Sequence, residues 1–80
     1  MPTDRDPPYR WIHPEKQRYY NVFLVRDLFG DWTLLQCWGG MGSQLGGQRV
    51  VWVESREAGL RQIMAIGKRR RQRGYRETVA

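Results

Sequence analysis

The chain has little of what disulfide-stapled, zinc-binding or membrane-spanning proteins require. Its 80 residues include one cysteine, Cys37, and one histidine, His13. One cysteine cannot form an internal disulfide, and one Cys with one His cannot supply the roughly four ligands of a structural zinc site. No stretch approaches the ~20 apolar residues of a membrane helix, and Met1 to Pro8 lacks the apolar core of a signal peptide. We therefore expect a cytoplasmic protein with no metal and no membrane contact.

Signatures of catalysis and of nucleotide binding are also missing. A chain of this length forms one domain, and it buries only about 60% of its unfolded surface, which leaves little room for an enclosed active site. Cys37 stands in an apolar run and is expected to be a buried small hydrophobic residue, and His13 has no nucleophile arranged with it. The segment Gly40-Met-Gly42-Ser-Gln-Leu45 lacks the third glycine of a dinucleotide-binding loop, and no Gly-Lys-Ser/Thr follows it. We predict no catalytic residues, no enzymatic activity and no cofactor.

Positive charge is present in excess, and it is confined to one end of the chain. Residues 1–55 hold six Lys/Arg and six Asp/Glu, whereas residues 56–80 hold eight Lys/Arg and two Asp/Glu. The whole net charge of +6 therefore belongs to the last 25 residues. Most of these cations are arginines, whose planar guanidinium matches phosphate and stacks on bases. Localised, arginine-rich charge indicates a polyanionic partner.

Alternating apolar residues and turn signals predict a small sheet. We expect a flexible tail over residues 1–8 and one domain over residues 9–80. Residues 9–13 form a short strand or a lead-in, and residues 14–18 form a loop. Residues 19–27 and 32–39 are β-prone, and the short turn between them indicates an antiparallel hairpin. The glycine-rich residues 39–48 are expected to be a flexible connection, followed by a strand over residues 49–53.

One helix is expected after these strands, from about residue 56 to residue 73. Ser55 is a suitable N-cap, and Gly74 suits the position just after the helix. Leu60, Ile63, Met64 and Ile66 recur at helical spacing and cluster with Gly59 and Gly67 on one face, which should pack on the sheet. Residues 75–79 could add a short strand. The predicted fold class is α+β: a small twisted antiparallel sheet with one long helix packed on one face.

Several motifs in this order resemble the WGR domain family. The run from Trp32 through Trp38-Gly39-Gly40 to Gly46-Gly47-Gln48 is similar to the family signature, a strand ending in Trp-Gly-Arg followed by a short loop and Gly-Gln. The segment from Arg26 to Trp32 resembles the hairpin turn that precedes this signature in the family. Ser55 to Ala58 resembles the start of the family's helix, and the basic run ending in Gly74-Tyr75 resembles the family's C-terminal segment. The resemblance implies the α+β fold just described and a non-enzymatic binding role.

One departure limits what the resemblance implies about the site. In family members within DNA-break-sensing poly(ADP-ribose) polymerases, the Trp and the Arg of the motif contact DNA and neighbouring domains. Trp38 matches that Trp, but Gly40 stands where the family has Arg, so the role of the arginine does not carry over. Arg49 is a candidate for a compensating cation near the same loop.

These observations predict a nucleic-acid-binding module, with DNA favoured over RNA. One or two cations would suffice to complement the helix dipole, so the longer basic run favours a polyanion. Trp38 is either a core residue or an exposed ring that stacks on a base. The predicted nucleic-acid-binding residues are Trp38, Gly39, Gly40, Arg49, Lys68, Arg69, Arg70, Arg71 and Arg73. A protein-interaction adaptor is the alternative, and a peripheral membrane binder is the weakest, since the apolar helix face is needed by the sheet.

Overall fold

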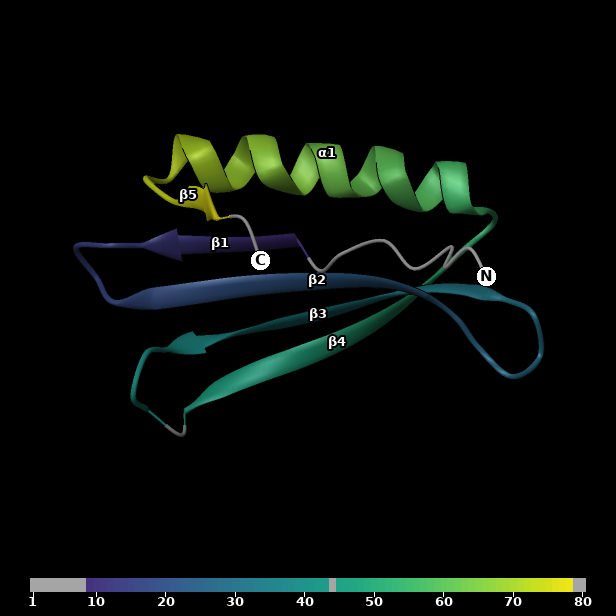
Figure 1. The fold of residues 1–80 in the computed structure, drawn as a ribbon, viewed down its shortest axis with the longest axis horizontal. Helices are drawn as coiled ribbons and strands as arrows, with labels where there is room; N and C mark the ends of the chain where they lie inside the picture. The colour runs from purple at the N-terminus through teal and green to yellow at the C-terminus, as the bar shows by residue number, and fades with distance from the viewer. Residues whose placement is uncertain (1–8, 44, 79–80) are drawn as a thin grey trace.

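The computed structural model describes residues 9–43 and 45–78. Within them, five strands form one sheet with the order β4-β3-β2-β1-β5, and every neighbouring pair is antiparallel. A single helix covers one face of the sheet (Figure 1). The elements are β1 (Tyr9–His13), β2 (Arg18–Arg26), β3 (Trp32–Gly40), β4 (Gly46–Val53), α1 (Arg56–Gln72) and β5 (Arg76–Thr78). The predicted α+β class is confirmed, and residues 9–13 form a strand. The tail expected over residues 1–8 lies outside the described residues.

A tightly hydrogen-bonded turn joins β2 to β3. One carboxylate oxygen of Asp27 accepts hydrogen bonds from the backbone N–H groups of Phe29 and Asp31, both at 2.9 Å. Such side-chain caps satisfy the backbone of a turn and hold its shape. The two strands then pair over their whole length, from Arg26↔Trp32 to Arg18↔Gly40. This long hairpin, which the sequence predicts, places the opposite ends of β2 and β3 beside the β3–β4 turn.

The helix crosses the sheet from one edge to the other. It follows β4 at one edge and leads into β5, which pairs with β1 at the other edge (Figure 1). Ser55 caps its start, since its hydroxyl accepts a hydrogen bond from the backbone N–H of Ala58 at 3.1 Å. Gly74 follows its end with a φ of +92°, a left-handed conformation that favours glycine. Both predicted helix boundaries are therefore correct to within one residue, and the basic end of α1 lies near the β1–β5 edge of the sheet.

The core fills the space between α1 and the sheet. Alternate positions of each strand point toward the helix, and each fully buried apolar side chain contributes about 1.5–3 kcal/mol. The helix lies close to the sheet at Gly59, where an added Cβ would come within 2.6 Å of Leu24 Cδ1. The buried apolar residues are Trp11, Val22, Leu24, Leu34, Val53, Ile63 and Ile66.

The prediction that Met64 packs on the sheet is wrong, because its side chain is 73% exposed. Ile63 is buried, as expected, and Leu60 packs against the edge of the core. Gly59 and Gly67 are both buried, so the backbone at these glycines, rather than a stripe of large side chains, faces the sheet. The contact stripe is therefore rotated toward Ile66. Met64 then lies at its margin, about 100° around the helix from Ile63.

Two further expectations need correction. The expected connection over residues 39–48 is shorter, because β3 runs to Gly40 and β4 begins at Gly46. Gly46 and Gly47 pair with Gly39 and Trp38 in the ladder instead of forming a loop. Cys37 is half-buried on the face of the sheet away from α1 rather than in the core.

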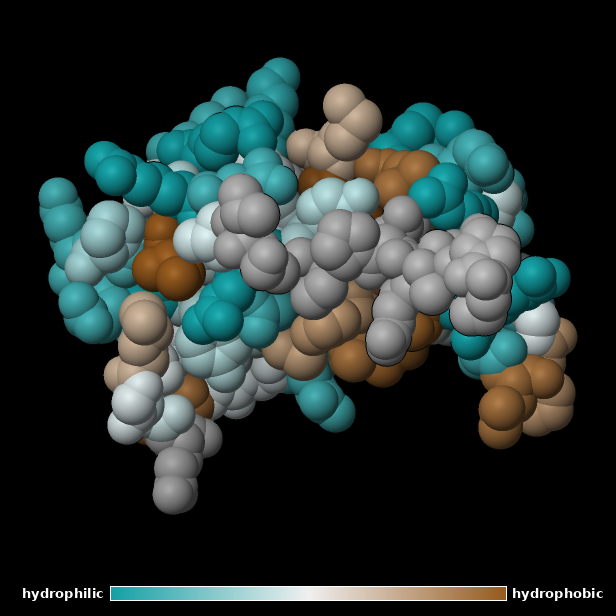
Figure 2. All heavy atoms as spheres, in the orientation of Figure 1, coloured by the Kyte–Doolittle hydropathy of each residue, from teal (hydrophilic) through white to brown (hydrophobic). Residues whose placement is uncertain are grey.

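The face of the sheet opposite α1 carries apolar side chains. Val50 and Trp52 on β4 are each 64% exposed, and neither packs against the core. At the tip of the β2–β3 hairpin, Leu28 and Phe29 are almost fully exposed, and Figure 2 shows apolar atoms there. Hydrophilic atoms crowd the opposite end of the molecule around the C-terminal turns of α1 (Figure 2). The hairpin tip thus exposes apolar side chains, whereas the C-terminal turns of α1 are hydrophilic.

Candidate nucleic-acid interface

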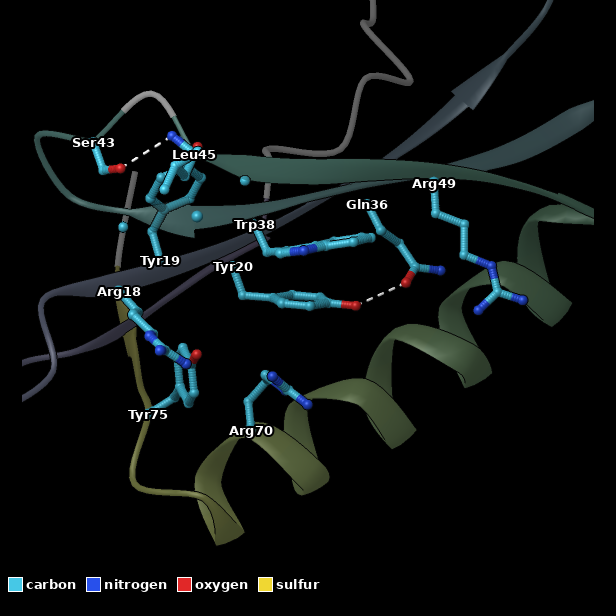
Figure 3. Close-up of a pocket in the computed structure, with 13 residues that line it drawn as sticks. Arg18, Tyr19, Tyr20, Gln36, Trp38, Ser43, Leu45, Arg49, Arg70 and Tyr75 are labelled. Carbon is cyan, nitrogen blue, oxygen red and sulfur yellow. Dashed lines mark hydrogen bonds between the residues drawn. The ribbon is translucent and has the colours of Figure 1, made fainter.

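An open groove lies between the C-terminal half of α1 and the ends of β2 and β3 (Figure 3). It has a volume of about 590 Å³. Strands β2, β3 and β4, the β3–β4 turn, helix α1 and Tyr75 all contribute residues to its walls. The lining residues are Arg18, Tyr19, Tyr20, Gln36, Trp38, Gly39, Gly40, Ser43, Leu45, Gly46, Arg49, Arg70 and Tyr75.

Two aromatic rings, those of Tyr20 and Trp38, line the middle of this groove (Figure 3). The two residues are cross-strand neighbours on the helix face of β2 and β3. The rings of Tyr20 and Trp38 stack with a centroid distance of 6.0 Å and an interplanar angle of 14°. The hydroxyl of Tyr20 donates a hydrogen bond of 2.8 Å to Gln36 Oε1. Since Gln36 is buried, this bond fixes the Tyr20 ring, and with it the position of Trp38.

Gly47 sets the other boundary of the Trp38 ring. It is the cross-strand partner of Trp38 on β4, on the side away from Tyr20. A Cβ at this position would come within 2.7 Å of Trp38 Cζ2 and 2.9 Å of Cε2. The indole therefore lies between the Tyr20 ring and the Gly47 backbone, and it exposes only 37% of the residue. Trp38 is held rigidly at the groove rather than standing free at a strand end.

Arg70 is the central cation of the groove. Its guanidinium lies over the ring of Tyr20, 4.6 Å from the centroid, and 5.1 Å from the centroid of Tyr75. Each such cation–π contact contributes about 0.5–1 kcal/mol or more. Arg70 Nε is buried and has no hydrogen-bond acceptor. Buried donors normally have an acceptor, so this guanidinium is positioned by rings and lacks an anionic partner.

Three arginines from three different elements line the groove. Arg18 belongs to β2, Arg49 to β4 and Arg70 to α1, and within residues 9–43 and 45–78 no acidic residue lines the groove with them. Figure 3 shows Arg18 and Arg49 at opposite ends, with the stacked rings between them. Three guanidinium groups without a carboxylate create a positive potential, which attracts an anionic ligand. Planar groups beside these cations suit a ligand that also has rings.

A smaller pocket adjoins the groove between α1 and the β4 edge. Its volume is about 220 Å³, and it shares Gln36 and Arg49 with the groove. Arg69 reaches this pocket from the helix, and the described residues that line it again include no acidic one. Its remaining lining residues are Val51, Gln62, Ala65 and Ile66.

The structure brings together some of the residues that the sequence predicts as a site. Trp38, Gly39, Gly40, Arg49 and Arg70 line the groove. Arg69 lines the adjoining pocket. Lys68, Arg71 and Arg73 line neither of the two. The long basic run therefore divides, because successive helical residues point about 100° apart.

Sequence reasoning missed the residues that β2 and the C-terminal segment contribute. Arg18 is the direct partner of Gly40 across the hairpin, and Tyr20 and Tyr75 hold Arg70. For Arg18 and Tyr20 a signal was available. The turn at residues 27–31 fixes the register of the hairpin, and counting back from it places them opposite Gly40 and Trp38. For Tyr75 we find no such signal, because its position depends on how β5 returns to β1.

Comparison with protein families gives a match to the model of the WGR domain over residues 10–80. The chain belongs to the WGR domain family. A search of the curated proteins and a search of the solved structures found no match. WGR domains are binding modules, and those of poly(ADP-ribose) polymerases bind nucleic acid.

In this WGR domain the third motif position lies inside the groove. The chain reads Trp38-Gly39-Gly40, and Gly40 forms part of the groove wall. Its partner Arg18 projects from the next strand, on the same face of the sheet. Cross-strand partners have Cβ positions about 4.5–5.5 Å apart. An arginine residue is therefore the cross-strand neighbour of the position from which the family arginine is missing.

Other kinds of site find little support among the described residues. In residues 9–43 and 45–78, no three His, Cys, Asp or Glu side chains are grouped so that they could hold a metal ion. Over the same residues, no helix has the length and apolar character needed to cross a membrane.

Proposed function

We propose that this WGR domain binds nucleic acid, DNA in the first place, through the groove between α1 and the ends of β2 and β3. The observation that carries the proposal is the convergence of Arg18, Arg49 and Arg70 on a groove to which the described part of the chain contributes no acidic residue. Phosphate oxygens supply acceptors for these groups. The family match supports the same class of partner.

In this proposal the two kinds of groove residue have different tasks. The arginines contact backbone phosphates, which gives affinity with little dependence on sequence. Trp38 is enclosed by Tyr20 and Gly47, so it shapes the groove and presents its exposed edge to the ligand. Lys68, Arg71 and Arg73 lie outside the groove and add a diffuse attraction that raises the association rate. Of the two roles that the sequence suggests for Trp38, stacking on a base or anchoring the ligand, we favour anchoring.

Fluorescence anisotropy with a labelled 12-nucleotide single strand, the corresponding duplex and an RNA of the same sequence tests this proposal. Each phosphate contact contributes about −0.7 to the slope of log K against log salt for single strands and about −0.9 for duplex DNA. Arg18→Gln or Arg49→Gln should weaken binding several-fold and reduce the slope by about that amount. Arg61→Gln is the matched control, because Arg61 is exposed on the same helix and lines neither pocket. Absence of binding at low salt, or equal effects of all three variants, contradicts the proposal.

A protein partner is the second candidate. Val50 and Trp52 are largely exposed on the face away from the groove, and so are Leu28 and Phe29 at the hairpin tip. Apolar surface of this kind marks interaction sites in soluble proteins. The Asp27-capped turn holds the two tip residues in a fixed place. This surface and the groove lie on different parts of the molecule, so a protein partner and a nucleic acid could bind together.

A further inference from the structure

We infer that Arg49 and Arg69 form a second phosphate subsite, so that the groove holds at least two phosphates of one strand at the same time. The inference rests on the proposed function and extends it from one anionic group to a ligand of defined minimum length. The subsite is the 220 Å³ pocket between α1 and the β4 edge. It opens beside the groove, and Arg49 lines both.

Arg18 and Arg49 lie too far apart for one phosphate to contact both. Arg18 pairs with Gly40 and Arg49 pairs with Gln36, so the two arginines stand four residues apart along β3 and two strands apart across the sheet. This separation is about 13 Å along the strands and about 10 Å across them, or roughly 16 Å between their Cα atoms. Figure 3 shows the stacked rings of Tyr20 and Trp38 between them. As these side chains lie, one phosphate contacts one end, and a second phosphate is needed to engage the other.

The helix supplies one cation to the middle of the groove and one to its Arg49 end. Arg69 and Arg70 are consecutive, so their side chains leave α1 about 100° apart. Arg70 turns toward Tyr20 and Tyr75 in the groove, whereas Arg69 turns toward Arg49 at the β4 edge. A pair of consecutive arginines thus serves two adjacent sites. Two phosphate sites explain why the basic run holds more cations than are needed to complement the helix dipole.

The chemistry of the second pocket fits a phosphate of an oligonucleotide backbone. Arg49 and Arg69 repel one another when no anion lies between them, since like charges at close range are destabilising. Gln36 and Gln62 can add neutral amide donors, and no carboxylate in the lining competes for the guanidinium groups. Both arginines are exposed, so their contribution is screened by salt, as expected for contacts with a backbone at the rim of a site.

Thymidine ligands that carry one, two and four phosphates test the inference, each competing with the labelled 12-nucleotide strand. Arg69→Gln should leave the affinity for the one-phosphate ligand within about two-fold of wild type. It should weaken the binding of the four-phosphate ligand by about two- to five-fold, which is the range of effects measured for exposed charge pairs. Its salt slope on the 12-nucleotide strand should fall by about 0.7. Arg18→Gln should weaken the binding of all these ligands. Arg69→Lys should restore most of the slope, because it retains the charge.

A control variant and two different negative results distinguish failure of the second subsite from failure of the proposed function. Arg61→Gln should change neither the phosphate-number dependence nor the slope by a comparable amount, and circular dichroism should show that each variant keeps its fold. If Arg69→Gln weakens all ligands in equal proportion, or weakens none, the second subsite is refuted while the proposed function stands. If the wild-type protein binds none of the ligands and not the 12-nucleotide strand either, the proposed function fails, and the subsite fails with it.

Discussion

Gly47→Ala should destabilise the protein and distort the groove, although it changes no charge. The new Cβ would lie 2.7 Å from Trp38 Cζ2, where ordinary contacts begin at 3.4 Å, so the indole must retreat by about 0.7 Å. Overpacking of this kind costs about 1–3 kcal/mol, and loss of the stack with Tyr20 costs about 0.5–1.5 kcal/mol more. Replacing glycine by alanine stabilises the protein by about 0.4–1 kcal/mol, because it lowers the conformational entropy of the unfolded chain. The expected net loss is about 2 kcal/mol, within a range of about 0.5–4 kcal/mol.

Gly40→Ala is the matched control, because the nearest atom to its Cβ would be Ser43 Cβ at 3.3 Å, at the end of a small exposed side chain. Thermal unfolding should give a Tm lower by at least 4 °C for Gly47→Ala, since about 1 kcal/mol corresponds to 4–8 °C in a domain of this size. A two-dimensional NMR spectrum should show the indole N–H signal of Trp38 displaced more than those of the other three tryptophans. Affinity for DNA should fall with an unchanged salt slope. A Gly47→Ala protein as stable as the Gly40→Ala protein, with an undisturbed Trp38 signal, would refute the enclosure of Trp38 by Gly47.

The packing of the helix gives two further predictions. Ile63 is 3% exposed and Met64 is 73% exposed, so Ile63→Ala should cost about 2–4 kcal/mol and Met64→Ala no more than about 0.5 kcal/mol. Equal losses in denaturant unfolding would show that the helix packs through a different face. Gly74 has a φ of +92°, and its Cβ would lie 2.9 Å from His13 Nε2, so Gly74→Ala should cost about 1–2 kcal/mol or more. Unchanged stability of that variant would contradict the left-handed helix end.

The sequence predicts the elements well wherever a local pattern decides them. The Ser55 cap and the glycine at position 74 define the helix, and the turn at residues 27–31 defines the hairpin. Local patterns fail where packing decides. The glycines at 46 and 47 are typical of a loop, but they lie in a strand because the Trp38 ring needs the space above Gly47. Met64 has the right spacing for a core residue, yet the close approach at Gly59 rotates the contact surface away from it.

The candidate site is harder to predict, because its parts are distant in the sequence. The basic run indicates the class of ligand, but only the direction of each side chain separates Arg69 and Arg70 from Lys68, Arg71 and Arg73. Arg18 belongs to the part of the chain with no net charge, and its importance depends on the register that places it beside Gly40. Tyr75 enters the site through the return of β5 to β1. Such non-local contacts leave no periodic trace in the sequence.

The most direct test of the groove as the nucleic-acid interface is an NMR titration of the nitrogen-15-labelled protein with a short DNA oligonucleotide at low salt. Trp38 lies in the groove and Trp52 lies on the opposite face of the sheet, so the two indole N–H signals report on the two surfaces. The account predicts that the signals of Trp38, Gly39, Gly40 and Arg70 shift as DNA is added, while those of Trp52, Leu28 and Phe29 do not. Shifts confined to Trp52 and the hairpin tip, with the groove signals unchanged, would contradict it.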